Sequence, residues 1–388
     1  MLLRTITLFA FALLAGCSSL TDLKTDISER MFGPEPKDPP MALAEFKQKA
    51  TATLLWSASI GEAEGYNFTP ALDGKAVFAA NAKGEITRID AVSGKQAWRI
   101  NAGERISGGV GAGENLVLVG TSRGMVLAFD QSGKSLWKAK VSSEVLSAPK
   151  VSAGTVVVRS GDSRIFGLSV ADGKRKWVYE RATPSLALRS SAGVTLADGA
   201  AYVGFAGGKL VAIKVDDGKM LWEASVALPK GVTEIERIAD ITSLPVVDGR
   251  TVYAVAFQGR VAAVDRTNGR VLWNRDISSY TGLNAQDSKV FVTHSGGAVY
   301  ALDYASGKSF WRQGGLLNRL VSAPLPTGEY VAVGDLEGYV HFLSREDGAF
   351  AARIQTDKTP VMAQPVEVGD GTLMVQTSGG GLYAIALK

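Results

Sequence analysis

Two histidines and a set of recurring aspartates are the side chains best suited to acid–base chemistry. His294 and His341 lie in different copies of a repeated phrase, which favours turn or packing positions for both. No HExxH, GxSxG, P-loop or CxxC motif occurs, and a single cysteine cannot form a metal cluster. We therefore expect no catalytic residue, no cofactor and no metal, and a protein that is not an enzyme. The aspartates recur at one place of the phrase, which favours turn residues over acid–base groups: Asp90, Asp130, Asp265 and Asp303.

The single cysteine, Cys17, follows an apolar run at residues 8–15. This run is too short for a membrane span of roughly 20 residues and is typical of a secretory signal. The letters LAGC at residues 14–17 resemble the bacterial lipobox, which implies cleavage before Cys17 and lipidation of its thiol. The alternative is a buried free thiol. By the same resemblance, Ser18 in place of aspartate implies sorting to the inner leaflet of the outer membrane.

Tryptophans at intervals of 38 to 51 residues reveal the elements that must position any site. Six of them end a copy of one phrase, such as GKLVAIKVDDGKMLW at residues 208–222. An apolar run, a Gly-Lys turn and a second run ending in tryptophan predict two strands joined by a hairpin. A second strand pair precedes each copy, so the unit is a four-stranded propeller blade. The tryptophans are Trp56, Trp98, Trp137, Trp177, Trp222, Trp273 and Trp311.

The number of copies predicts eight blades. A seventh copy at residues 338–350 continues to Ala352 where the tryptophan is expected, and an eighth at 380–388 stops at the C-terminus. The segment at residues 51–58 carries Trp56 without a phrase before it. We expect this strand to pair with the C-terminal blade and close the ring, which removes open sheet edges. The predicted fold class is an all-β, eight-bladed β-propeller of four-stranded antiparallel blades.

The domain organisation follows from these patterns. We expect a lipoprotein signal peptide at residues 1–16, a lipidated N-terminus and flexible tether at 17–50, and the propeller at 51–388. The tether is proline-rich and carries no repeat, and a short helix is expected at its end, at residues 41–50. A formal net charge of +4 without a dense basic stripe argues against a nucleic-acid partner.

Two long intervals between tryptophans predict the working surface. The extra residues follow Trp177 and Trp222, in connections between successive blades that leave the same face. One contains Leu186, Leu188 and Arg189, and apolar side chains with charged neighbours are typical of a protein-binding site. The alternative, that both leucines begin an inner strand and are core, has equal support from the spacing. The second connection supplies the charges Glu234, Glu236, Arg237 and Asp240.

The repeat phrase resembles that of quinoprotein dehydrogenases, periplasmic propellers that bind pyrroloquinoline quinone (PQQ) and Ca²⁺. Those enzymes are much longer and typically carry a disulfide between adjacent cysteines, which a chain with one cysteine cannot form. Fold similarity alone carries no activity. A PQQ-dependent periplasmic dehydrogenase and a carbohydrate- or peptidoglycan-binding propeller remain the alternatives.

The combination of a lipobox, a short tether and this propeller resembles the BamB (YfgL) family of outer-membrane lipoproteins. These are subunits of the β-barrel assembly machinery (BAM complex). The most specific stretches are PSLALR at residues 184–189, TEIERIADIT at 233–242 and VGDLEGYVHFLSREDG at 333–348. The resemblance implies a lipid-anchored, non-enzymatic scaffold at the periplasmic face of the outer membrane. It would be a monomer within its complex and would assist the insertion of β-barrel proteins.

The same resemblance implies the partner and the contacts. Family members bind the periplasmic POTRA (polypeptide-transport-associated) domains of BamA, the barrel-forming subunit, and unfolded outer-membrane proteins are further candidate partners. The family pattern has a second acidic residue where this chain has Thr242. Carried over residue by residue, the expected contacts are Leu186, Leu188, Arg189 and Asp240.

Overall fold

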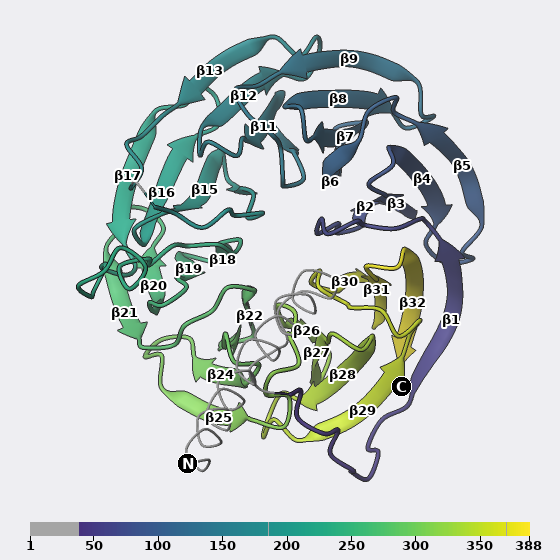
Figure 1. The fold of residues 1–388 in the computed structure, drawn as a ribbon, viewed down its shortest axis with the longest axis vertical. Coiled ribbons are helices and arrows are strands. Elements are labelled where there is room, and N and C mark those ends of the chain that lie inside the picture. The colour runs from purple at the N-terminus through teal and green to yellow at the C-terminus, as the bar shows by residue number, and fades with distance from the viewer. Residues whose placement is uncertain (1–38, 185, 370) are drawn as a thin grey trace, which may run out of the picture. The chain divides into compact units, whose positions relative to one another are not determined.

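The structure is a computed structural model that describes residues 39–184, 186–369 and 371–388. Residues 41–388 form one compact unit. This unit consists of 32 strands in eight four-stranded antiparallel sheets, arranged as blades around a central axis (Figure 1). The described residues contain no helix. The predicted eight-bladed propeller is therefore confirmed.

The first four blades each use four strands in chain order, from the innermost to the outermost. Blade one is β2 (Ala71–Asp73), β3 (Ala76–Ala80), β4 (Glu85–Asp90) and β5 (Gln96–Asn101); blade two is β6 (Ile106–Gly113), β7 (Leu116–Thr121), β8 (Met125–Asp130) and β9 (Ser135–Lys140); blade three is β10 (Lys150–Ser152), β11 (Thr155–Arg159), β12 (Ile165–Ser169) and β13 (Arg175–Tyr179); blade four is β14 (Thr195–Ala197), β15 (Ala200–Phe205), β16 (Lys209–Lys214) and β17 (Met220–Ser225).

The next three blades repeat this order, and blade eight combines both ends of the chain. Blade five is β18 (Val246–Asp248), β19 (Thr251–Val255), β20 (Val261–Asp265) and β21 (Val271–Arg275); blade six is β22 (Gly282–Gln286), β23 (Lys289–Thr293), β24 (Val299–Asp303) and β25 (Ser309–Gln313); blade seven is β26 (Leu325–Thr327), β27 (Tyr330–Gly334), β28 (Tyr339–Ser344) and β29 (Phe350–Gln355); blade eight is β30 (Val366–Gly369), β31 (Thr372–Gln376), β32 (Gly381–Leu387) and β1 (Ala52–Ser59).

Each tryptophan joins its blade to the next through one repeated contact. The indole of Trp177 donates a hydrogen bond to the main-chain oxygen of Val215 at 2.8 Å and packs against Gly218. Gly218 has a φ of +74°, and a Cβ there would lie 2.7 Å from the indole. The turn therefore requires glycine both for its backbone conformation and for the close approach of the ring. The other six tryptophans make the same bond to the following blade.

The ring closes as expected. β1 pairs antiparallel with β32, with Trp56 opposite Ala384 (Figure 1). The Trp56 indole then donates to the main-chain oxygen of Ala91 in blade one at 3.0 Å and covers Gly94. The strand that precedes the first repeat phrase therefore supplies the missing outer strand of blade eight.

The prediction of a short helix at residues 41–50 is wrong. The main chain there bonds to the blades instead of to itself, from the Met41 amide to the Leu317 oxygen and from the Lys49 amide to the Ala351 oxygen. Blade seven carries Ala352 where the other blades carry tryptophan, and Ala50 joins the apolar cluster around Ala352. The apolar cluster between blades seven and eight is thus completed by the N-terminal segment.

We predict that Trp56→Ala destabilises the whole propeller, because it removes the contact that joins blades eight and one. Large aromatic-to-alanine changes in cores cost about 3–5 kcal/mol, and the half-buried indole places Trp56 near the lower end. The free energy of unfolding in denaturant measures the effect. Leu55→Ala is the matched control, because Leu55 is adjacent to Trp56 and its side chain is 50% exposed. We expect this variant to change the free energy of unfolding by no more than about 0.5 kcal/mol. Equal losses for the two variants would contradict the closure scheme.

Candidate functional site

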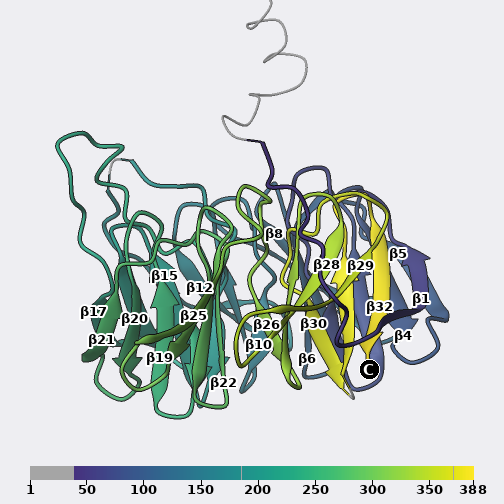
Figure 2. The same ribbon diagram turned by 90° about the horizontal axis from the view of Figure 1, so that it is seen from below.

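The two long connections lie together on one face of the propeller. Because the strands of a blade alternate in direction, every connection from an outer strand to the next inner strand leaves the same face. We call it the loop face. Residues 180–194 join β13 to β14 and residues 226–245 join β17 to β18. Both rise above the strands at the left of Figure 2, and the Leu188 amide bonds to the Asp240 side chain at 2.7 Å.

Leu186 and Leu188 are surface residues. Their relative exposures are 42% and 36%, and the inner strand of blade four begins later, at Thr195. The first buried apolar residue of this connection is Ala192. The interpretation of the two leucines as core is therefore excluded, and the chain exposes two apolar side chains on one short loop.

Asp240 was expected in the charged rim, but the structure buries it at 4% exposure. Its Oδ2 accepts the Leu188 amide and its Oδ1 accepts the Gly207 amide at 3.0 Å. Its main-chain oxygen accepts the Phe257 amide at 2.8 Å. Asp240 thus joins the loop that carries Leu186 and Leu188, which we call the leucine loop, to blades four and five. The position of Leu188 depends directly on this carboxylate.

A buried arginine supports the same loop from below. Arg159, 7% exposed, donates from Nη1 to the main-chain oxygens of Ala192 at 3.2 Å and Gly204 at 2.9 Å. Burial lowers the pKa of Arg159 to about 10, and the charge of Asp240 acts in the opposite direction. The guanidinium therefore stays protonated at neutral pH. No motif marks Arg159, and its one signal in the sequence is that an arginine stands where blade one has Ala80 at the same repeat position.

Arg189 extends the leucine loop with an exposed positive charge. Its side chain is 67% exposed, and its Nε lies 3.5 Å from Oε1 of Glu144. A hydrogen bond from Ser143 and, more weakly, the charge of Arg189 lower the pKa of Glu144. Such a surface ion pair contributes only about 0–1 kcal/mol. Arg189 can therefore exchange Glu144 for another carboxylate at little cost.

The second connection presents further apolar side chains at its tip. Val232 is 96% exposed and Ile235 is 67% exposed. The Glu236 carboxylate accepts the amides of Val232 and Thr233 at 2.8 and 3.1 Å, and these bonds lower the pKa of Glu236. The Glu236 amide donates back to the Thr233 hydroxyl at 3.2 Å. This reciprocal pattern is a capping box, and the TxxE spacing at residues 233–236 was the signal that could have identified it.

We group the exposed residues of these two neighbouring connections under one name, the loop patch. It combines exposed apolar residues from both connections with an exposed arginine, and Glu234 and Arg237 are exposed beside it. Thr242 lies next to it, and its hydroxyl donates to the Tyr280 oxygen at 3.1 Å. The loop patch consists of Leu186, Leu188, Arg189, Leu228, Val232 and Ile235.

The remaining candidate residues occupy structural positions. His294 accepts the Gly296 amide at 2.9 Å, and His341 is fully buried and bonded to Asp335. Each recurring aspartate accepts hydrogen bonds within its own turn, as Asp90 does from Ser93 at 2.8 Å. Among the described residues no group of His, Cys, Asp or Glu has a metal-binding arrangement. Cys17 lies outside the described residues.

The central cavity bears on the quinoprotein alternative. It has a volume of about 660 Å³ and is lined mainly by glycine, serine, threonine and aliphatic residues. Lys150 is its one charged lining residue among those that the structure describes, and no carboxylate reaches it. Ca²⁺ is bound by carboxylate and other oxygen ligands, usually with several acidic groups. The lining therefore does not fit the metal that accompanies PQQ.

The residues that the structure describes include no helix that could cross a membrane.

Comparisons with known proteins agree with this geometry. The family model described as outer membrane protein assembly factor BamB matches residues 48–106, 82–313 and 297–388. A relative of that name from Burkholderia pseudomallei is 42% identical over 89% of this chain and 90% of its own length. Another from Nitrosomonas eutropha is 40% identical over the whole chain and 95% of its own length.

Solved structures show the same fold. The crystal structure of BamB from Moraxella catarrhalis superposes with a TM-score of 0.80 at 27% identity, covering 87% of this chain and 100% of that one. Quinohemoprotein alcohol dehydrogenase from Comamonas testosteroni reaches a TM-score of 0.70 at 15% identity, covering 86% and 76%, a likeness of fold alone. From the family model and the full-length relatives, this chain belongs to the BamB family of outer membrane protein assembly factors.

Proposed function

We propose that this protein is a non-enzymatic scaffold subunit of the outer-membrane β-barrel assembly machinery, and that its loop patch binds the POTRA domains of BamA. Its relatives carry the name of outer membrane protein assembly factor. The observation that carries the binding site is the pair Leu186 and Leu188, exposed on a loop that hydrogen bonds from the buried side chains of Asp240 and Arg159 hold in place. Binding in this way assists the folding and insertion of barrel proteins.

The energetics suit a small number of anchor residues. Full burial of an exposed leucine side chain contributes about 1.5–3 kcal/mol, and Leu186 and Leu188, which are 42% and 36% exposed, can each add the corresponding share on binding. A loop that is already ordered loses little conformational entropy on binding, so more of this energy appears as affinity. Arg189 adds specificity, because its weak pair with Glu144 is replaced by a carboxylate of the partner.

Asp240 has a different role from the leucines in this proposal. Its carboxylate holds the Leu188 and Gly207 amides and does not reach the surface. It therefore acts on binding through the position of the leucine loop. Thr242, at the family's second acidic position, donates to Tyr280 and contributes no charge.

The proposed location follows from the N-terminus. Residues 1–16 are a signal peptide, Cys17 carries the lipid, and the tether leads to the propeller at the periplasmic face of the outer membrane. Several acyl chains give stable anchoring, because each buried CH₂ contributes about 0.8 kcal/mol.

The double variant Leu186→Ala/Leu188→Ala tests the binding site. We expect affinity for purified BamA POTRA domains, measured by titration calorimetry, to fall by at least about 2 kcal/mol. The melting temperature should stay nearly unchanged, because both side chains are exposed. Leu136→Ala/Leu272→Ala is the matched control, since those leucines are 47% and 46% exposed on outer strands. Wild-type affinity in the first variant would refute the assignment.

Asp240→Ala separates a positioning role from a direct contact. The change leaves two partly buried amides without an acceptor, which costs up to about 1–3 kcal/mol. We expect faster hydrogen exchange at the Leu188 amide together with weaker POTRA binding. Asp216→Ala, which removes a largely exposed carboxylate, should change neither. Weaker binding with unchanged Leu188 exchange would instead identify Asp240 as a direct contact.

Cys17→Ala tests the anchor. The variant should keep its signal peptide and lose acylation, because the thiol is the attachment point. Cell fractionation is best done in the Leu186→Ala/Leu188→Ala background, which removes retention through BamA. The variant that combines Cys17→Ala with the two leucine changes should then leave the outer-membrane fraction. The variant with the two leucine changes alone should stay there. Equal retention of both would exclude Cys17 as the anchor.

A further inference from the structure

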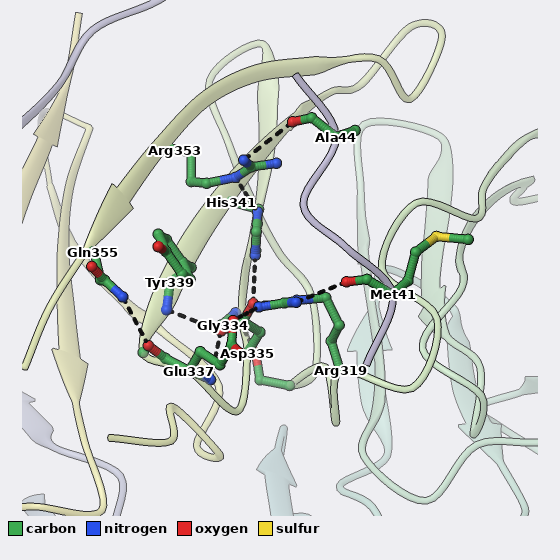
Figure 3. A network of polar contacts seen from close by, with 12 residues as sticks. Met41, Ala44, Arg319, Gly334, Asp335, Glu337, Tyr339, His341, Arg353 and Gln355 are labelled. Carbon is green, nitrogen blue, oxygen red and sulfur yellow. Dashed lines mark hydrogen bonds and ion pairs between the residues drawn. The ribbon is translucent and has the colours of Figure 1, made fainter. Parts of the chain in front are cut away.

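A buried polar cluster in blade seven holds the N-terminal segment. Arg319, in the connection from β25 to β26, donates from Nε to Oδ2 of Asp335 at 2.8 Å and from Nη1 to the Met41 oxygen at 2.8 Å (Figure 3). Arg353 of β29 donates from Nη1 to the Ala44 oxygen at 3.2 Å. Two arginines therefore bind two main-chain carbonyls of one extended segment.

The two arginines are linked through a histidine. His341 Nε2 lies 2.9 Å from Oδ2 of Asp335, and Arg353 Nε donates to His341 Nδ1 at 3.0 Å. A guanidinium only donates, so Nδ1 must accept and the ring is neutral with its proton on Nε2. Arg319 is 2% exposed, and Asp335 and His341 are fully buried. The carboxylate, the imidazole and both guanidiniums thus form one continuous network (Figure 3).

Aromatic packing completes the site. The ring of Phe46 stacks on Phe350 with centroids 5.4 Å apart. The guanidinium of Arg353 lies 5.0 Å from the Phe46 centroid and 5.3 Å from that of Phe350. The amides of Lys49 and Ala50 both bond to the Ala351 oxygen. The segment is therefore bound along its length, from Met41 to Ala50.

The cluster also gives a structural role to the sequence stretch at residues 333–348, which lies outside the loop patch. Residues 333–348 contain Asp335, His341 and Glu337, and Glu337 pairs with Arg319. Among the described residues of the chain, His341 is the one fully buried histidine. Its blade is also the one that lacks the tryptophan, where Ala50 packs.

The bound segment starts on the loop face. The Met41 amide bonds to Leu317 and the Met41 oxygen to Arg319, and both partners belong to the β25–β26 connection. This is an outer-to-inner connection, like the two that carry the loop patch. We propose that Arg319, Asp335, His341 and Arg353 form a histidine-gated clamp for the protein's own N-terminal segment. The clamp fixes residue 41, which follows the proposed lipid-anchored tether, to the face that binds the partner, and this role rests on the proposed lipid anchor.

Protonation of His341 opens the clamp. A proton on Nδ1 removes the acceptor of Arg353 Nε and places a third positive charge beside two guanidiniums. The groups facing the ring are Asp335, Arg353, Tyr339 and, through Asp335, Arg319 with its partner Glu337. Arg353 then loses its orientation toward the Ala44 oxygen and Phe46.

The direction with pH follows from the shifted group. Burial lowers the pKa of His341 below its ordinary 6.5, Asp335 opposes this, and Arg353 and Arg319 add to it. Burial alone would raise the pKa of Asp335, but hydrogen bonds from His341 and Arg319 outweigh it and lower that pKa. Asp335 therefore stays ionised while His341 titrates. A depressed histidine pKa means that the clamped state is fully stable above about pH 6.5 and loses stability as the pH falls below it.

Hydrogen exchange of the full lipidated chain in detergent micelles tests the clamp. The peptide covering residues 41–50 is followed at about pH 7.5 and 5.5, with rates corrected for intrinsic chemistry. We expect severalfold faster exchange at the lower pH, because protonated His341 no longer accepts the hydrogen bond that orients Arg353. His341→Gln keeps a donor for Asp335 and an acceptor for Arg353 without titrating, so its exchange should not depend on pH. His294→Gln, which changes the other histidine of the chain, should behave like the wild type.

Several outcomes would overturn the proposal. They are pH-independent exchange in the wild type, an unchanged pH response in His341→Gln, or a lost response in His294→Gln. Phe46→Ala provides a test that leaves the buried network intact, and it should release the segment at both pH values with a small change in melting temperature. Full protection in Phe46→Ala would also refute the clamp. None of these measurements involves BamA, so they stand apart from the binding tests of the loop patch.

Discussion

The contact between an indole and a glycine of the next blade is the constraint on which the structure depends. A blade of four strands cannot cover its own faces, and the two sheets beside it must do so. A tryptophan supplies a large apolar surface and one hydrogen bond at every junction except that between blades seven and eight, as Trp177 does to Val215. Since the facing turn has no room for a Cβ at Gly218, the tryptophan of one blade and the glycine of the next form a single unit. This pairing explains the period of the sequence.

Blade seven departs from this rule and acquires another function. Its outer strand carries Ala352, and Ala50 completes the junction with blade eight, whereas Phe46 stacks on Phe350 in the cluster between blades six and seven. A junction built from a terminal segment differs from one built from a tryptophan, because the segment can separate while the blades stay folded. The buried arginines and His341 set the conditions for that separation. Stability and a conformational change thus use the same irregularity of the repeat.

The loop patch lies on long loops that the rigid propeller holds in a fixed position. Long loops are usually flexible, but Asp240 and Arg159 bind main-chain atoms of the leucine loop from a buried position. The charges of Asp240 and Arg159 lie beneath the surface, whereas Leu186 and Leu188 lie on it. Affinity is then expected to come from apolar burial, whereas the buried charges maintain the shape that makes this burial specific. The proposed contact with POTRA domains uses this arrangement.

The sequence by itself determined the repeat, the eight blades, the closure by the strand containing Trp56 and the position of the long connections. These features follow from local patterns, since strand periodicity, turn glycines and tryptophan spacing act within one blade or between neighbours. Three features depended on the tertiary structure: the exposure of Leu186 and Leu188, the burial of Asp240, and the extended course of residues 41–50. Each depends on contacts between segments that are distant in the chain. A local propensity favoured a helix at residues 41–50, but hydrogen-bond partners in blades six and seven outweighed it, and no pattern within that segment encodes those partners.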